Sequence, residues 1–308
     1  MTPQAAVLPI YAKLTAVALV WGGSFIAARI VAQEMPTFTA ALWRYVIATT
    51  ALVALSILLE RGLPRLSRAQ MLGVCLLGLT GVVLYNALFL YGLQSVQASR
   101  GSLIIATVPA ATLIGGALFL HEPLTWRRGA GIAIALLGVA IELGRGNPLT
   151  ILQGHAGIGE AALFGAVLAW AAYTLLGRRL LTELSPLAAT TYAALVGTVL
   201  LALLCIATGD FAVPAANQRG WISLLFLGLL GTALAYIWFY DGVHAIGPAR
   251  TSVFVNLVPI AAITFAVLLL NEPLLPSMIV GAVLVVSGVF IINWPAGADA
   301  AAAATPSH

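Results

Sequence analysis

Charged residues are scarce in this chain. Among its 308 residues, Asp, Glu, Lys and Arg together make up only 8%, whereas a soluble domain carries about 25%. So few charges cannot cover a water-facing surface, which excludes an ordinary soluble protein. The formal net charge of +4 comes from basic residues scattered between apolar runs, and the chain has no Lys/Arg-rich run. We therefore expect no nucleic-acid partner.

Cysteine and histidine are also rare. The two cysteines, Cys75 and Cys205, lie within apolar runs, and the chain has four histidines. This pattern fits neither a disulfide framework nor a metal site. The sequence also lacks a His-Glu-x-x-His motif, a Gly-x-Ser-x-Gly motif and a pair of acids near a histidine. We therefore expect no metal, no cofactor and no enzymatic activity.

Apolar residues, in contrast, dominate. They make up 61% of the chain, and the mean hydropathy is +1.05. About 20 apolar residues are needed to cross the hydrocarbon core of a bilayer as a helix. We therefore predict an all-α integral membrane protein with ten transmembrane helices and a disordered tail over 295–308. The predicted spans are 12–32, 37–59, 70–91, 98–120, 127–144, 157–177, 186–208, 219–240, 248–270 and 276–293.

The basic residues predict the orientation of these spans. With the N-terminus in the cytoplasm, nine Lys and Arg residues fall in cytoplasmic segments and three in outer segments. An excess of Lys and Arg marks the cytoplasmic side of a membrane protein. We therefore predict a multi-pass protein of the cytoplasmic (inner) membrane, and ten spans place both termini in the cytoplasm. No link between spans is long enough to hold a soluble domain.

Two parts of the chain are similar at a fixed offset of 150 residues. Segments 98–124 and 248–274 are identical at ten of 27 positions, and each contains Val-Pro and ends in Glu-Pro-Leu. Each half then holds five spans, an odd number. We therefore predict two five-helix repeats, 1–147 and 148–294, of which the second is inverted. Inverted repeats are typical of secondary transporters that bind substrate near the membrane midplane.

Several motifs resemble a known family. Trp21-Gly22-Gly23-Ser24-Phe25 and the paired Val-Pro and Glu-Pro segments are similar to those of the drug/metabolite transporter superfamily, EamA type. The resemblance implies a cytoplasmic-membrane exporter of metabolites, often amino acids, that works by alternating access around a central cavity. Exporters of aromatic amino acids are the most similar group. A broad-specificity drug exporter is the alternative.

The acidic residues bear on the driving force. All ten lie near the ends of spans or in links, and none lies near the middle of a span. Small multidrug-resistance relatives, which carry a glutamate in the middle of the membrane, differ in this respect. We therefore expect a small neutral or zwitterionic metabolite, moved by facilitated diffusion or exchange. We expect the protein to be a monomer or a weak oligomer.

Polar and aromatic residues near mid-span are the candidate substrate-binding residues. A buried amide without a partner costs roughly 1–3 kcal/mol, and a cavity offers water or substrate as that partner. Packing between helices is an equally good explanation for each residue. Trp21 and Trp170 are matched at an offset of 149, which favours a place at a central cavity. The candidates are Trp21, Ser24, Tyr85, Asn86, Thr107, Trp170, Tyr173, Tyr236 and Asn256.

Basic and proline residues within spans allow further hypotheses. Arg44 could bind a substrate carboxylate, extend to the outer surface or pair with a helix C-terminus, and we favour a structural role. Pro109 and Pro259 break backbone hydrogen bonds at matched places, so we predict paired hinges. The matched Glu122 and Glu272 are expected to cap, orient or gate rather than to bind substrate.

Overall fold

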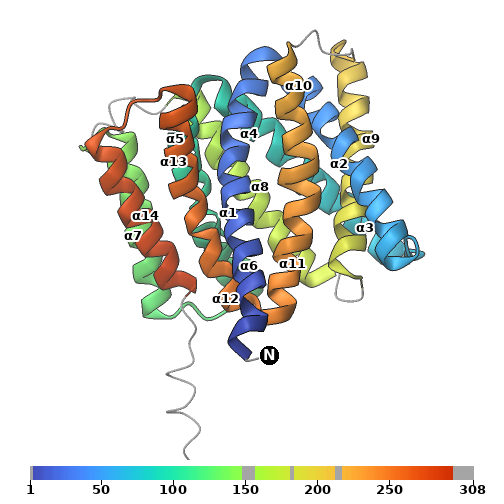
Figure 1. Ribbon diagram of the computed structural model, residues 1–308, viewed down its shortest axis with the longest axis horizontal. Helices are drawn as coiled ribbons and strands as arrows, with labels where there is room; N and C mark the ends of the chain where they lie inside the picture. The colour runs from blue at the N-terminus through green and yellow to red at the C-terminus, as the bar shows by residue number, and fades with distance from the viewer. Residues whose placement is uncertain (1–2, 148–156, 181–183, 212–216, 294–308) are drawn as a thin grey trace, which may run out of the picture.

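The computed structural model describes residues 3–147, 157–180, 184–211 and 217–293, which are helices and the links between them (Figure 1). The predicted disordered tail, 295–308, lies outside the described residues. Six helices are single elements: α1 (Pro3–Glu34), α2 (Thr37–Glu60), α7 (Trp126–Leu143), α8 (Ile158–Leu180), α9 (Pro186–Thr208) and α14 (Pro276–Asn293).

Four further rods are composite. Two contain a π-helical middle: α3 (Arg68–Leu77), η1 (Gly78–Leu84) and α4 (Tyr85–Ser95), and likewise α10 (Gln218–Leu225), η3 (Phe226–Leu234) and α11 (Ala235–Ile246). Two are broken near the middle: α5 (Ala98–Ile105) with α6 (Val108–Leu120), and α12 (Pro248–Val255) with α13 (Leu257–Leu270). The described residues therefore form ten helical rods, at the places of the ten predicted spans.

Nine of these rods are long and apolar enough to cross a membrane. The tenth, α7, is 18 residues long and carries Arg127, Arg128 and Glu142. Its partner in the structure is α14, against which it packs along its length (Figure 1). The prediction of an all-α integral membrane protein is confirmed.

The rods run alternately between two ends of the molecule. We call the upper edge in Figure 1, where α1 ends and α5 and α8 begin, the Glu272 end. The opposite edge, where α6 ends and α12 begins, is the Glu122 end. Helix α1 begins at the Glu122 end, and α14 finishes there. Helix α8, which is equivalent to α1 in the proposed repeat, runs in the opposite direction to α1 (Figure 1).

Glycines allow α7 and α14 to cross closely. A Cβ atom on Gly138 would lie 2.7 Å from the carbonyl oxygen of Gly281, and one on Gly131 would lie 2.8 Å from that of Gly288. Small residues let membrane helices approach backbone to backbone. Gly131 and Gly138 are matched in the sequence to Gly281 and Gly288. The repeat therefore relates the Gly138–Gly281 contact to the Gly131–Gly288 contact. Reciprocal contacts of this kind are expected of a twofold-related pair.

The π-helical segments occupy matched places in the two halves. Segment η1 begins at Gly78 and η3 at Phe226, two residues before Gly228. A π-helix disturbs the regular ladder of backbone hydrogen bonds and often lies at functional sites. Side chains bond to the disturbed carbonyls: the Nδ2 of Asn86 donates to Val82 O at 2.8 Å, and the Oγ1 of Thr232 donates to Leu227 O at 2.9 Å.

Candidate substrate site

Helices α4 and α8 bring together three of the predicted residues. The ring of Tyr85 lies 4.7 Å from that of Trp170, and Trp170 lies 5.1 Å from Tyr173, measured between centroids. Tyr85 also stacks on Phe89 at 5.5 Å. Trp170 belongs to the second half of the chain and packs on an aromatic residue of the first half.

Helices α1 and α11 form a corresponding group. Trp21 lies 6.1 Å from Tyr236 and 5.4 Å from Phe239, and Tyr236 lies 6.2 Å from Tyr240. The indole N–H of Trp21 donates to the carbonyl oxygen of Gly231 at 3.1 Å, which fixes the ring. Trp21 belongs to the first half and packs on rings of the second half. Each of the two matched tryptophans therefore contacts the half of the chain to which it does not belong.

Tyrosine hydroxyls of the two groups lie within electrostatic range of one another. The hydroxyl of Tyr236 interacts electrostatically with those of Tyr45, Tyr85, Tyr173 and Tyr240. We call these five residues the tyrosine cluster. Tyr45 and Tyr240 were not among the sequence candidates. Tyr240 could have been identified from the sequence, because it lies one turn after Tyr236 and so on the same face of the helix.

A cavity of about 150 Å³ leads from the Glu122 end to this cluster. Glu60 and His244 lie at its mouth, and Thr190, Tyr236 and Tyr240 line it. Lys13 and Asp241 form an ion pair of 2.6 Å beside the mouth. The cavity is therefore open toward the Glu122 end.

Arg44 lies on α2, farther from the mouth. Its charge interacts electrostatically with Tyr85, and its Cζ lies 5.8 Å from the ring centroid of Tyr45. Only 9% of Arg44 is exposed, and its Nε and Nη1 atoms have no hydrogen-bond partner. No carboxylate in the described part of the chain forms an ion pair with it. The side chain does not extend to the outer surface, which was one sequence alternative.

Four other candidates lie in different surroundings. The hydroxyls of Ser24 and Thr107 donate to carbonyls of their own helices, Val20 O at 2.9 Å and Ile104 O at 2.6 Å. Asn86 is completely buried and bonds to η1, so it supports the π-helix. Asn256 lines a separate apolar groove of about 360 Å³ beside α14, and both polar atoms of its amide lack partners. The structure thus does not bring Asn256 to the tyrosine cluster.

The helix breaks lie just before the two candidate hinge prolines. The first half breaks at residues 106–107, and Pro109 occupies the first turn of α6. The second half breaks at Asn256, before Pro259 in α13. A hinge role for either proline stays a prediction.

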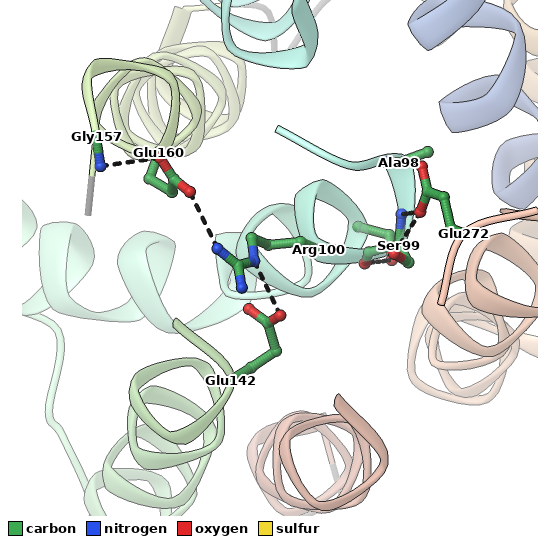
Figure 2. Close-up of polar contacts among 8 residues, drawn as sticks. Ala98, Ser99, Arg100, Glu142, Gly157, Glu160 and Glu272 are labelled. Carbon is green, nitrogen blue, oxygen red and sulfur yellow. Dashed lines mark hydrogen bonds and ion pairs between the residues drawn. The ribbon is translucent and has the colours of Figure 1, made fainter. Parts of the chain in front are cut away.

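The Glu272 end is closed by two charged side chains around the turn between α4 and α5. The carboxylate of Glu272 accepts hydrogen bonds from Ala98 N at 2.8 Å, Ser99 N at 3.0 Å and the hydroxyl of Ser99 (Figure 2). The guanidinium of Arg29 donates to the carbonyls of Leu93 and Val96 at the end of α4. We call Arg29 and Glu272 the Glu272 bracket. Glu272 caps a helix, which is one of the three roles expected for it from the sequence.

A second network at this end joins three helices. Arg100 on α5 donates to Glu142 of α7 at 3.0 Å and to Glu160 of α8 at 3.3 Å (Figure 2). Glu160 also accepts from Gly157 N at 3.0 Å, at the start of α8. All three charged side chains are mostly buried, so these ion pairs are shielded from water.

The Glu122 end is arranged differently. Glu122 and Arg178, which match Glu272 and Arg29 in the repeat, pair with each other at 3.4 Å and are much more exposed. At the Glu272 end α5 packs against α13 and α1 packs against α4. Among the described residues, the equivalent helices at the Glu122 end, α12 with α6 and α8 with α11, share no comparable contact. The molecule is therefore closed at one end and open at the other.

Comparison with known proteins gives consistent results. The sequence profile of the EamA-like transporter family matches residues 9–143 and 157–294. The chain is 30% identical to the uncharacterized transporter YyaM of Bacillus subtilis, over 92% of each chain. It is also 30% identical to the "Probable terminal-alkyne amino-acid exporter" of Streptantibioticus cattleyicolor, over 89% of each chain.

A solved crystal structure has the same fold. The TM-score is 0.65 at 18% sequence identity, over 93% of this chain and 98% of the other. At this identity the likeness shows the fold alone.

Proposed function

Because the chain belongs to the EamA-like transporter family of multi-pass membrane transporters, we propose that it exports small metabolites, amino acids in particular, across the cytoplasmic membrane. The observation that carries the proposal is a cavity that opens at the Glu122 end and is lined by Tyr236 and Tyr240, in a molecule whose other end is closed. A carrier needs a central site that faces one side at a time.

We further infer that the two halves are inverted repeats that alternate between two arrangements. The opposite directions of α1 and α8, the reciprocal glycine contacts of α7 and α14, and the matched π-helices support this inference. Most Lys and Arg residues in the links and near the ends of the rods lie at the Glu122 end, and by the positive-inside rule this distribution favours the cytoplasm for that end. In this orientation the structure faces the cytoplasm and is ready to load a solute for export.

The lining favours amino acids over cationic drugs. Tyrosine and tryptophan rings with polar tips suit a small solute that has an apolar side chain and a polar head. A buried arginine beside the cluster repels cations, and the cavity is small for a drug-sized molecule. The similarity to an amino-acid exporter agrees with this choice, and aromatic amino acids fit the aromatic walls best.

Flux in proteoliposomes tests the proposal. We expect saturable, protein-dependent uptake of labelled phenylalanine, reduced by other large apolar amino acids and unaffected by cationic dyes. Competition by the dyes and not by amino acids would instead support the drug exporter. Non-saturating ion conductance without solute flux would contradict a carrier of either kind.

A further inference from the structure

Arg44 carries a buried charge that nothing in the described part of the protein neutralises. It is 9% exposed, its Nε and Nη1 atoms lack hydrogen-bond partners among the described residues, and Tyr45 and Tyr85 lie close to it. Keeping a guanidinium in apolar surroundings is costly unless an anion compensates it. Five N–H groups in a planar fork match the two oxygens of a carboxylate.

We infer that Arg44 anchors the carboxylate of the transported solute. It lies about two helical turns farther from the open end than Leu52, which lines the cavity. A solute that reaches Arg44 would therefore lie among the tyrosine rings, between the two ends. This inference deepens the proposed function and rests on it, because it names the chemical class of the solute.

No acidic partner for an ammonium group accompanies Arg44. Among the described residues, the acids that line the cavity are Glu60 and Asp241, both at the mouth, and Asp241 already pairs with Lys13. The faces of the tyrosine rings tolerate an ammonium without requiring one. The site should therefore bind carboxylic acids and zwitterionic amino acids, and reject amines of the same size.

Three probes of nearly equal size separate these possibilities: phenylalanine, 3-phenylpropionate and 2-phenylethylamine. Their binding to the purified protein can be followed by thermal unfolding, which does not require transport. We expect phenylalanine and 3-phenylpropionate to raise the melting temperature and 2-phenylethylamine to leave it unchanged. Equal stabilisation by the amine, or none by either carboxylate, would overturn the inference.

Arg44→Gln provides the second test. Loss of a charge-assisted hydrogen-bond pair should weaken 3-phenylpropionate binding by about tenfold or more. The solute-free variant should melt at the same temperature as the wild type or higher, because an uncompensated buried charge is removed. Arg65→Gln, in an exposed link, is the matched control and should change neither property.

A lower melting temperature of Arg44→Gln without solute, together with unchanged binding of 3-phenylpropionate, would show a structural role and overturn the inference. Absence of saturable flux for any amino acid, with carboxylate binding intact, would instead contradict only the proposed transport.

The unequal ends of the molecule carry a second, independent inference. The Glu272 bracket uses three donors on α5: Ala98 N, Ser99 N and the Ser99 hydroxyl. At an offset of 150, the equivalent positions on α12 are Pro248 and Ala249. Proline has no N–H group and alanine no hydroxyl, so Glu122 could accept only one of the three equivalent hydrogen bonds.

Gly116 strengthens this asymmetry. A Cβ atom on Gly116 would lie 2.6 Å from Oε2 of Glu122, so the absence of a side chain allows Glu122 to fold back toward its own helix. The equivalent position near Glu272 is Ala266. We propose that Glu122 and Arg178 form a weaker counterpart of the Glu272 bracket. This counterpart closes the Glu122 end only when the Glu272 end opens. The imbalance makes the conformation open at the Glu122 end the resting state.

Gly116→Ala tests this proposal by displacing Glu122 from its folded-back position. Hydrogen exchange in lipid nanodiscs reports on both turns of the unlabelled chain. In the wild type we expect slow exchange over 96–101 and faster exchange over 246–251. In Gly116→Ala the protection of 246–251 should rise and that of 96–101 should fall.

Gly129→Ala is the matched control, since a Cβ atom there meets nothing within 4 Å. Ser99→Ala, which removes one donor of the Glu272 bracket, should shift both segments in the same direction as Gly116→Ala. Unchanged protection in both variants, or increased protection at both turns, would overturn the proposal.

Discussion

Asn86 and Asn256 are both buried amides in membrane-spanning rods, but only Asn86 has hydrogen-bond partners. The Nδ2 of Asn86 donates to Gly81 O and Val82 O, whereas neither polar atom of Asn256 has a partner among the described residues. We predict that Asn86→Leu lowers the stability of the solute-free protein by about 1–3 kcal/mol, because η1 loses its donor. Asn256→Leu should leave it unchanged or raise it. Tryptophan fluorescence on heating measures both variants, and equal losses would contradict the assignment.

Single residues also show where sequence reasoning was limited. The pattern predicted that Trp21, Tyr85, Trp170, Tyr173 and Tyr236 lie at interior depth, and the structure brings them into two aromatic groups, one on α4 and α8 and one on α1 and α11. It favoured a structural role for Arg44. Depth along a helix can be predicted from the sequence, but the direction of a side chain around the helix depends on packing with distant helices. The burial of Arg44 without a counterion in the described part of the chain became evident only in the structure.

At the scale of elements, the prolines explain where the broken helices break. Each proline lacks an N–H and its ring clashes with the carbonyl four residues earlier, which is Ile105 for Pro109 and Val255 for Pro259. The observed breaks, at 106–107 and at Asn256, begin directly after those residues. The sequence thus predicted bends, although each bend lies two or three residues before its proline.

Pro259→Ala tests whether the second break serves transport. Alanine supplies the missing N–H and allows α12 and α13 to merge into one straight helix. We predict that the rate of solute flux falls at least about fivefold while the folded yield stays close to that of the wild type. Pro109→Ala is the matched variant in the first half. Equal loss of yield and rate would indicate a packing role instead.

The crossing of α7 and α14 should be sensitive to one added methyl group. In Gly138→Ala the new Cβ would meet the backbone of Gly281 and Val285, which cannot move aside as a flexible side chain can. We predict a loss of about 1–3 kcal/mol from the forced separation of the helices. Gly129→Ala on the same helix controls for the general effect of alanine. A thermal unfolding series compares the two, and equal melting temperatures would contradict the close crossing.

At the scale of the whole molecule, the helical rods followed directly from hydropathy, because lipid demands long apolar helices whatever the tertiary fold, and nine of the ten described rods are apolar enough to cross a membrane. The open and closed ends could not be predicted in the same way. Matched residues such as Glu122 and Glu272 look equivalent in the sequence, and their different partners reflect one of two arrangements of the halves.

The distribution of charge over the whole molecule leads to the last prediction. The buried carboxylates of Glu142 and Glu272 are held by Arg100 and by the start of α5, away from the cavity, and among the described residues the acids that line the cavity lie at its mouth. A proton-coupled carrier needs an acid that the solute and the proton reach in turn. We therefore expect solute flux in proteoliposomes to continue at equal pH on both sides and to be unaffected by a protonophore. Strict dependence of the flux on an imposed pH gradient would contradict this prediction and direct the search to Glu60 and Asp241, whose neutral variants should then abolish the coupling.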